Sequence, residues 1–271
     1  MRRVQLVATV VLLAAVLAPA AQSSAATLST ASCGDPSATW CDEFNGAASS
    51  APDPAIWHFP TWACDNDPAA IEYCLKPSNA VIDGNGNLEL RLTAPGTQGR
   101  PYDGVRMNTW VSGSWPPRSF SYATRPHARV EARIKYAGDP GVWSGFWSES
   151  VDPTYVELDT SEVRLTYPTE AGCHLHGPFD WDGAAAVGSV KDWHVYAAEY
   201  FSDHVTFYVD DRVCGQVSLP PGFNTPRIGL EFDTKVGLPT SWGGIGGPPS
   251  APGQAYEADM LVDYVRVTES P

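Results

Sequence analysis

Three carboxylates fall within six residues of one strand-like run, at Glu157, Asp159 and Glu162. Acidic side chains this close repel one another, so a sequence keeps them where solvent or a chemical task offsets the repulsion. Side chains alternate between the faces of a strand, which puts Glu157 and Asp159 on one face and Glu162 on the other. One extra residue inserted as a β-bulge at Thr160–Ser161 would return Glu162 to the first face, and bulges are frequent beside active sites.

A row of acids along one strand suits the cleavage of a bond between two sugars. Retaining glycoside hydrolysis needs one carboxylate as nucleophile and one carboxylic acid as proton donor, about 5 Å apart. The middle acid, Asp159, could hold a proton or share one with the nucleophile. The spacing also allows another interpretation, an exposed charged strand edge on which Ser161 faces the same way as Glu157.

The flanking sequence favours the first interpretation. Glu157–Glu162 (ELDTSE) resembles the Glu-x-Asp-x-x-Glu signature of glycoside hydrolase family 16, in its bulged, laminarinase-like form. Other segments resemble motifs of that family in the expected order, namely Trp40–Gly46, Gly104–Thr109, Arg129–Lys135, Trp143–Trp147 and Met260–Val267. The resemblance implies an all-β jelly-roll sandwich whose concave face carries a carbohydrate-binding cleft.

The resemblance also implies roles for residues of the cleft. Glu157 would be the nucleophile, Glu162 the acid/base, and Asp159 the support of Glu157. Trp143 and Trp147 would be walls on which sugar rings stack, although core packing is an equal alternative for either one.

Further substrate-binding candidates follow from the same resemblance. Cys173–Gly177 (CHLHG) resembles the strand that faces the catalytic one, and alignment on its final glycine selects His176. Two residues separated by one share a strand face, so His174 could also reach the cleft. The alternatives are a zinc site, which would need a third ligand that we cannot nominate, and a pair of surface histidines. Asn108 and Arg106 carry over as hydrogen-bond donors to sugar.

A structural calcium ion is the one metal that the resemblance suggests, on the convex side of the sandwich. Asp263 is expected to share a strand face with Val265 and Val267, where an unpaired carboxylate would be costly. A calcium ion would satisfy Asp263, and so would backbone donors, which we favour. We expect that catalysis requires no cofactor.

The sequence departs from the family pattern close to the cleft. Thr160 and Ser161 are polar where laminarinase-like members commonly have apolar residues, and the approach from Trp147 to Glu157 is short. These changes bear on the substrate, because related branches cleave agar, carrageenan, xyloglucan or mixed-linkage glucan.

The N-terminus has the pattern of a secretory signal peptide. Arg2 and Arg3 precede an apolar run that ends at Ala18, and small residues follow up to Ala26. The run is shorter than the ~20 apolar residues that span a bilayer. We expect cleavage of residues 1–26, and a single secreted, extracellular domain over residues 27–271 without membrane association.

The net charge of the chain limits the classes of partner that it can bind. Removing Arg2 and Arg3 from the 17 basic residues leaves 15 against 31 acidic ones, a formal charge of −16. That balance argues against nucleic acid, whose binding needs a basic surface. It also predicts a cleft without the cationic side chains that sulfate esters need, and therefore a neutral β-glucan.

We therefore predict a monomeric, retaining endo-glycosidase that hydrolyses β-1,3 or mixed β-1,3/1,4 glucan. The alternatives are hydrolysis of a galactan such as agarose, transglycosylation by the same residues, and a glucan-binding module without activity. The presence of both catalytic glutamates disfavours the binding module.

Six cysteines in an exported chain predict disulfides rather than free thiols or a zinc site. They allow fifteen pairings, and proximity in the sequence favours two short pairs and leaves a third. The expected pairs are Cys33–Cys41, Cys64–Cys74 and Cys173–Cys214.

Apolar and polar residues alternate in Leu88–Thr93 and Val130–Lys135, which predicts half-buried strands. Val205–Val217 is typical of a hairpin that turns at Asp210–Asp211. Pro239–Gln254 is rich in Gly, Pro and Ser, which indicates a long loop. No repeat and no amphipathic helix is evident.

Overall fold

The computed structural model describes residues 35, 37–60, 64, 73–109, 122–123, 127–150, 155–177, 179–219, 227–237, 249–251 and 253–270. Within them the regular secondary structure is β-strand, apart from the 3-10 turn η2 (Pro77–Asn79). No helix in this part of the chain is long and apolar enough to cross a membrane. The predicted signal peptide, Cys33 and most of the predicted loop Pro239–Gln254 lie outside the described residues.

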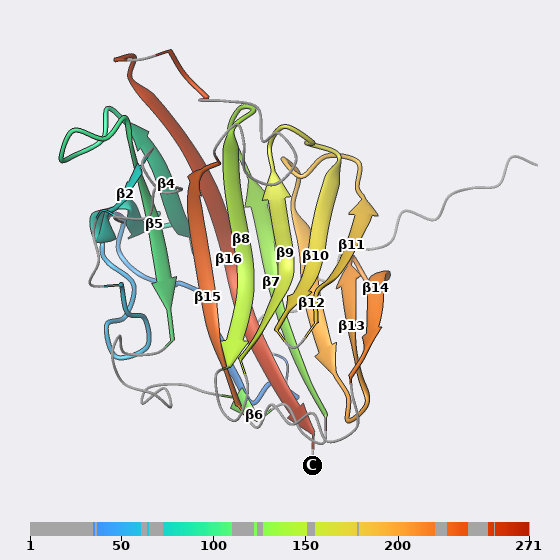
Figure 1. The fold of residues 1–271 in the computed structure, drawn as a ribbon. Coiled ribbons are helices and arrows are strands. Elements are labelled where there is room, and N and C mark those ends of the chain that lie inside the picture. Colours follow the sequence, from blue (N-terminus) through green and yellow to red (C-terminus); the bar gives the residue numbers. More distant parts are fainter. Residues whose placement is uncertain are drawn as a thin grey trace, which may run out of the picture.

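The strands follow one hydrogen-bonded path that folds over into two stacked layers (Figure 1). The layer that we call the cleft sheet contains, in spatial order, β5 (Tyr102–Asn108), β15 (Arg227–Val236), β8 (Val142–Ser150), β9 (Val156–Arg164), β10 (Glu170–His176) and β11 (Trp181–Ala186). The layer that we call the rear sheet contains β4 (Leu88–Ala94), β16 (Tyr256–Ser270), β7 (His127–Tyr136), β12 (His194–Tyr200), β13 (His204–Val209) and β14 (Arg212–Ser218).

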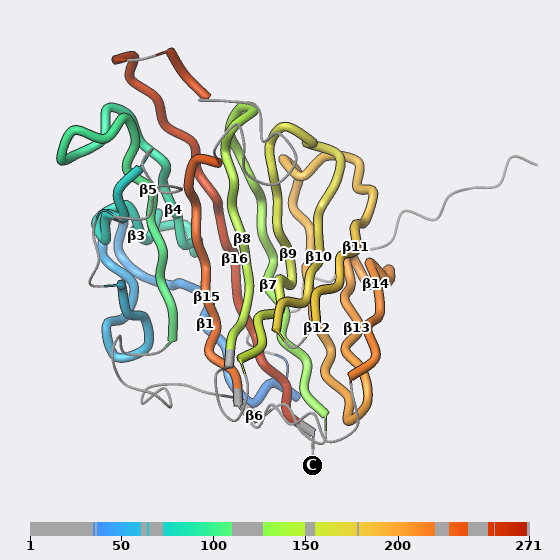
Figure 2. The backbone as a smooth tube through the Cα atoms, viewed as in Figure 1, coloured from blue at the N-terminus to red at the C-terminus, as the bar shows by residue number. Residues whose placement is uncertain are grey.

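Shorter strands extend the two layers. They are β1 (Trp40–Asp42) on β16, β2 (Tyr73–Leu75) on β5, β3 (Ala80–Ile82) on β4 and β6 (Tyr122–Ala123) on β15. At one edge, β4 and β5 join the sheets through the pair Thr93 and Asp103. At the other edge, β11 and β14 lie side by side (Figure 2). The result is the predicted all-β jelly-roll sandwich.

Side chains from both sheets fill the space between them. Leu88, Leu90 and Leu92 of β4 are fully buried, as their alternation predicts. Phe146 of β8 stacks on Phe232 of β15, with ring centroids 4.7 Å apart. Removing apolar surface from water at roughly 25 cal/mol per Å² is the main source of stability for such a core.

Buried polar groups of the sandwich are paired across the core. The Tyr136 hydroxyl of β7 lies 2.5 Å from the Ser161 hydroxyl of β9. In the same way, the Ser148 hydroxyl of β8 lies 2.7 Å from the Tyr200 hydroxyl of β12. Each pair connects the cleft sheet to the rear sheet and avoids the cost of an unsatisfied buried hydroxyl.

The predicted strand Val130–Lys135 is confirmed within β7, but its polar side is less exposed than simple alternation suggests. Glu131 is only 4% exposed. Its carboxylate accepts hydrogen bonds from Arg266 at 2.6 Å and from the Tyr264 hydroxyl at 3.1 Å. A buried carboxylate is tolerated here because an arginine from the neighbouring strand compensates its charge.

The predicted hairpin is confirmed by β13 and β14. Asp210 and Asp211 both have positive φ, 50° and 61°, the left-handed conformation that a two-residue hairpin turn requires. The Asp210 carboxylate accepts a hydrogen bond from the backbone N–H of Val195 at 3.0 Å and lies 2.6 Å from Nδ1 of His194. These contacts fasten the turn to β12.

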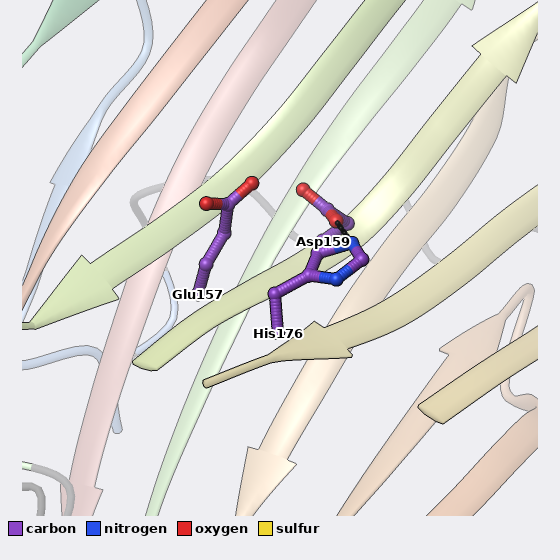
Figure 3. Close-up of side chains that lie close together, drawn as sticks. All are labelled: Glu157, Asp159 and His176. Atoms are coloured by element: carbon purple, nitrogen blue, oxygen red, sulfur yellow. Dashed lines mark ion pairs between the residues drawn. The ribbon is translucent and has the colours of Figure 1, made fainter. Parts of the chain in front are cut away.

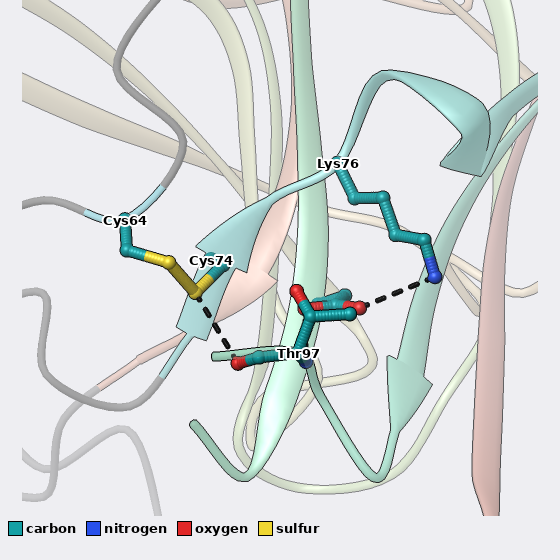
Figure 4. Close-up of a disulfide and its surroundings, with 5 residues drawn as sticks. Cys64, Cys74, Lys76 and Thr97 are labelled. Carbon is teal, nitrogen blue, oxygen red and sulfur yellow. Dashed lines mark hydrogen bonds and ion pairs between the residues drawn. A yellow bond between two sulfur atoms is a disulfide. The ribbon is translucent and has the colours of Figure 1, made fainter. Parts of the chain in front are cut away.

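Two of the expected disulfides, Cys64–Cys74 and Cys173–Cys214, are confirmed. The first lies beside β2, where Sγ of Cys74 is 3.6 Å from the carbonyl oxygen of Thr97 (Figure 4). Because Cys33 lies outside the described residues, its pairing with Cys41 stays a prediction.

The Cys173–Cys214 disulfide joins β10 of the cleft sheet to β14 of the rear sheet. Close by, the ring of Trp181 in β11 stacks on Phe207 of β13, with centroids 5.7 Å apart and an angle of 6° between the planes. The disulfide and this stack hold the two sheets together at the edge where they share no continuous strand pairing.

We predict that the double variant Cys173→Ala/Cys214→Ala loses about 3–4 kcal/mol of free energy of unfolding. The disulfide closes a loop of 41 residues, and its removal frees that length of unfolded chain. Urea unfolding of oxidised protein measures the loss. Cys64→Ala/Cys74→Ala, which opens a loop of only 10 residues, is the control and should lose less. Equal midpoints for the Cys173→Ala/Cys214→Ala variant and the unmodified protein would contradict the prediction.

Candidate active site

Strand β9 contains the bulge that the spacing of its acids predicts. In the register with β8, Trp147 lies opposite Asp159 and Phe146 lies opposite Ser161. Thr160 therefore has no residue opposite it and is the extra residue. The pairing of β9 with β10 shifts in the same place. One inserted residue changes which face every later side chain takes, as a bulge must.

The bulge brings the three acids to one face. Glu157, Asp159 and Glu162 all line a cleft of about 330 Å³ on the outer side of the cleft sheet. Ser161 instead points into the sandwich, where it is fully buried against Tyr136. The alternative of an exposed strand edge, with Ser161 facing the same way as Glu157, is therefore wrong.

Asp159 is the most perturbed of the three acids. It is 7% exposed. Burial, and then the neighbouring charges of Glu157 and Glu162, raise the pKa of Asp159 well above its ordinary value, while Lys235 opposes the shift. The neutral, protonated form is thus favoured, because it avoids a third negative charge beside the other two.

Two residues that the sequence analysis missed flank Glu157. The Tyr155 hydroxyl donates a hydrogen bond to Oε2 of Glu157. Glu149 lies opposite Glu157 in the pairing of β8 with β9. Burial, and next the charge of Glu157, raises the pKa of Glu149. A tyrosine donor and a carboxyl group that favours its neutral form both help an ionised Glu157 to exist in the cleft.

The strand facing β9 supplies His176, as predicted. Its Nε2 atom lies 3.5 Å from Oδ2 of Asp159, and its Nδ1 atom lies 3.2 Å from Oδ1 of Asp180. His174 also reaches the acids, with its Nε2 atom 3.4 Å from Oε2 of Glu162. Both histidines therefore face the cleft side of β10.

Ligand atoms of Glu157, Asp159 and His176 all lie within 4.8 Å of one another, and Figure 3 shows these side chains gathered over β9 and β10. The Tyr155 hydroxyl on Glu157 and the raised pKa of Asp159 both suit protons in this group.

The opposite side of the cleft carries two cations on one buried acid. Arg106 of β5 lies 3.2 Å from Oδ2 of Asp233, and Nζ of Lys235 lies 2.6 Å from the same oxygen. Burial would raise the pKa of Asp233, but Lys235 and Arg106 outweigh it and hold that pKa below its ordinary value. The expectation of a cleft without cationic side chains is therefore wrong.

The sequence contained a signal for this second cluster. Glu231, Asp233 and Lys235 alternate with apolar or small residues along β15, so all three share one face of the strand. Arg106 pairs with Asp233 in the register of β5 with β15, which brings the predicted arginine onto the same face. Only the topology of the sheet shows that this face adjoins the acids of β9.

The two predicted tryptophans line the cleft, but each has a cation over its ring. The guanidinium of Arg106 is 5.1 Å from the ring centroid of Trp147, and Nζ of Lys235 is 4.4 Å from that of Trp143. Trp147 is only 8% exposed. Trp147 therefore packs in the cleft floor rather than forming an open wall, and Lys235 covers ring surface of Trp143 that a sugar would otherwise stack on.

Asn108 is not brought to the cleft. It is 1% exposed, and its backbone exchanges hydrogen bonds with that of His58. By alternation Asn108 shares the face of Arg106, yet it does not line the cavity. Its predicted contact with sugar is not supported, because the segment around His58 pairs with this end of β5.

Comparison with known proteins connects this geometry to a family. A family model described as glycosyl hydrolases family 16 matches residues 73–225. The chain belongs to this family. It is therefore a glycoside hydrolase, as predicted.

The relatives of this family 16 chain have low sequence identity to it but align with most of its length. The beta-glucanase of Rhodothermus marinus is 26% identical over 260 residues, covering 84% of this chain and 83% of that protein. The glucan endo-1,3-beta-glucosidase A1 of Niallia circulans is 24% identical over 258 residues, covering 84% of this chain but 37% of that protein. The solved structure of the laminarinase from Rhodothermus marinus has a TM-score of 0.69 at 23% identity, covering 86% of this chain and 96% of that one, which shows the fold.

The calcium ion suggested for this family 16 chain does not fit the residues present at Asp263. A bulge in the pairing of β16 with β7 turns Asp263 away from the buried face of Val265 and Val267, so its predicted placement is wrong. Its Oδ2 atom accepts a hydrogen bond from Nη1 of Arg133 at 2.7 Å. The carboxylate of Asp263 is therefore paired with a guanidinium rather than with a backbone donor.

Arg133 also stacks on Trp193 at 4.7 Å, so its position is fixed from two sides. Glu43, Asn45 and Asn85 line the same cavity of about 300 Å³. A divalent cation placed there would meet the charge of Arg133, which opposes binding.

We predict that a chelator leaves the thermal midpoint of the unmodified protein unchanged. Arg133→Met should lower the free energy of unfolding by the ~0–1 kcal/mol typical of a partly exposed ion pair, and with it the thermal midpoint slightly. Differential scanning calorimetry with and without EDTA measures both effects. A chelator-dependent fall in the midpoint of the unmodified protein would show that this cavity holds a metal ion despite Arg133.

Proposed function

We propose that this chain is a secreted, retaining endo-glycosidase that hydrolyses β-1,3-linked or mixed β-1,3/1,4 glucan. Its nucleophile is Glu157 and its acid/base is Glu162. The observation that carries this proposal is the bulge at Thr160, because it places both glutamates on the same cleft. Secretion is supported by the signal-like pattern of residues 1–26.

The reaction proceeds in two displacements. Glu162 gives its proton to the glycosidic oxygen while a carboxylate oxygen of Glu157 attacks the anomeric carbon. The carbon–oxygen bond to the leaving sugar breaks, and a covalent glycosyl ester forms on Glu157. Glu162, now ionised, then takes a proton from water, whose oxygen attacks the anomeric carbon and releases Glu157. Two inversions return the original configuration.

The neighbours of the two glutamates support different states of this cycle. The Tyr155 hydroxyl stabilises negative charge on Glu157 before attack. The proton favoured on Asp159 keeps charge low between the two glutamates. Lys235 places a positive charge near Asp159, so the electrostatic balance of the cleft depends on residues from both of its sides.

A glucan is the substrate favoured by the relatives, whose names describe a beta-glucanase and a glucan endo-1,3-beta-glucosidase. Charge within the cleft agrees with a neutral polymer. Four carboxyl groups line it, those of Glu157, Asp159, Glu162 and Asp233, against two cations that are both paired with Asp233.

A galactan is the second candidate, and the cations of the cleft are the observation that favours it. Arg106 and Lys235 could also meet a substituted or anionic sugar if either one left Asp233. Transglycosylation would use the same two glutamates, with a sugar hydroxyl in place of water. A module that only binds glucan is disfavoured because the complete acid set is present.

We predict distinct failures for the two glutamate variants. Glu162→Ala should slow hydrolysis of polymer by about 10²–10⁴-fold, because the leaving oxygen no longer receives a proton. It should retain activity on aryl glycosides with good leaving groups and be accelerated by azide. Glu157→Ala should hydrolyse neither substrate, yet couple α-glycosyl fluorides to acceptor sugars.

Kinetics on both substrate types, with proton NMR of the first product, test this assignment. The first product should have the β configuration. Identical behaviour of the two variants on both substrate types would contradict the roles, and α-configured first product would contradict the double displacement.

We predict that laminarin is hydrolysed fastest in a panel of polysaccharides at equal mass, followed by mixed-linkage glucan. Agarose is the galactan to test first, and carrageenan and porphyran should rank last because both cations of the cleft are already paired with Asp233. Release of reducing ends measures the order. Turnover limited to a galactan would overturn the substrate and leave the chemistry standing.

A further inference from the structure

His174 bridges the acid/base and the edge strand of the cleft sheet. Its Nε2 atom lies 3.4 Å from Oε2 of Glu162, and its Nδ1 atom lies 2.8 Å from Oδ1 of Asp182. Asp182 of β11 is the residue opposite His174 in the strand register. The side chain of His174 is only 11% exposed, whereas that of Asp182 is 66% exposed. An aspartate at the surface is thus connected through one imidazole to Glu162.

The neighbouring glycine makes this contact possible. A Cβ atom at Gly172 would lie 2.5 Å from Nε2 of His174, closer than real Cβ atoms approach any heavy atom. The imidazole therefore occupies the space that a side chain at position 172 would take. Gly172 is also the residue opposite Glu162. The ring reaches Glu162 because this one position has no side chain.

The Asp182 carboxylate fixes the orientation and the tautomer of the ring. A carboxylate at 2.8 Å accepts the proton on Nδ1, so Nε2 is the nitrogen that faces Glu162. One exchangeable proton then lies between Nε2 and Oε2, on either the glutamic acid or the imidazole. In both placements the contact links the protonation of Glu162 to that of His174.

We propose that His174, held by Asp182, is a positioning residue that keeps a proton on Glu162 for the first displacement. The inference rests on the proposed role of Glu162 as acid/base. His174 transfers nothing to substrate. The proton goes from Glu162 to the glycosidic oxygen and returns to Glu162 from water, and His174 extends the pH range over which Glu162 carries it.

The other ionisable groups around Glu162 come from several strands. Asp159 precedes it on β9, Tyr136 of β7 lies on the core side of β9 within reach of its charge, and His176 stacks beside His174 with ring centroids 6.1 Å apart. Asp233 and Lys235 act on Asp159 from β15. None of these lies between His174 and Asp182, so a change at Asp182 acts on Glu162 chiefly through the His174 ring.

His176 forms a parallel set of contacts with a different target. Its Nδ1 atom lies 3.2 Å from Asp180, and its Nε2 atom lies 3.5 Å from Asp159 rather than from Glu162. The contacts of His174 therefore reach the acid/base Glu162, whereas those of His176 reach the supporting acid Asp159. A change at Asp182 should therefore affect proton retention on Glu162, and a change at Asp180 should not.

The test is the pH profile of kcat/KM, measured on the polymer that the unmodified enzyme hydrolyses fastest. Asp182→Asn and His174→Phe should each move the basic limb to lower pH, by about half to one pH unit, because the contact of His174 with Glu162 is weakened in the first variant and lost in the second. Gly172→Ala, which displaces the ring without deleting it, should move the limb the same way. Because Asp182 is exposed, Asp182→Asn tests the proposal even if His174→Phe fails to fold.

The matched control is Asp203→Asn. Asp203 lies 2.7 Å from Nδ1 of His204, next to β13, so the same chemical change is made to an aspartate–histidine pair outside the cleft. It should leave the basic limb unmoved. A basic limb that stays in place, or moves to higher pH, in folded Asp182→Asn would overturn the proposal.

A second readout separates this inference from the proposed function. On aryl glycosides with good leaving groups, whose first displacement needs no proton from Glu162, the kcat/KM of Asp182→Asn should match that of the unmodified enzyme at every pH. Loss of activity there would show a merely structural role and overturn the proposal. If Glu162→Ala instead kept full activity on polymer, the assignment of the acid/base would fail, whatever the profile of Asp182→Asn.

Discussion

The cleft depends on a single constraint of strand geometry, which is that side chains alternate between two faces unless a residue is inserted. Thr160 is that insertion. With it, Glu162 faces the cleft beside Glu157 and Asp159, while Ser161 faces Tyr136 in the core. The bulge has a local cost, since Oγ1 of Thr160 is buried without a hydrogen-bond partner in the described structure. Cost of this kind is expected where function rather than stability determines the backbone.

Once the acids share a face, their mutual repulsion governs the rest of the site. Three features of the structure reduce this repulsion. Burial and neighbouring charge favour a proton on Asp159 and raise the pKa of Glu149. Lys235 supplies a positive charge from the next strand but one, and Asp233 in turn keeps that charge in place. The histidines of β10 contact Asp159 and Glu162 from the other side. No single neighbour neutralises the cluster, which leaves individual carboxyl groups free to differ in protonation.

Much of the fold and of the catalytic strand was predictable because both follow local rules. The alternation of Leu88, Leu90 and Leu92 predicts β4, and the charges of Glu157–Glu162 predict the bulge. The same parity rule failed at Asp263, where a bulge in β16 is marked by no cluster of like charges and turns the carboxylate toward Arg133. A sequence shows a bulge only where the unbulged strand would be chemically costly.

Other features of the site could not be read from the sequence because they depend on which strands become neighbours. Asp233 and Lys235 alternate visibly on β15, yet nothing local places β15 beside β8, and only that pairing sets their charges across from the acids. The expected lack of cations able to bind sulfate esters at the cleft was inferred from net charge, which averages over the whole surface. Net charge describes association and solubility and does not determine the sign of any one site.

The edge strand β11 connects the stability of the sandwich to its chemistry. Trp181 points inward and stacks on Phe207 of the rear sheet, beside the Cys173–Cys214 disulfide. Asp182, the next residue, must then point outward, where it meets His174. The position of the Asp182 carboxylate is therefore set by an aromatic contact and a disulfide on the opposite face of the same strand. An edge strand without those attachments would fray readily, and Asp182 would no longer be held against the ring that contacts Glu162.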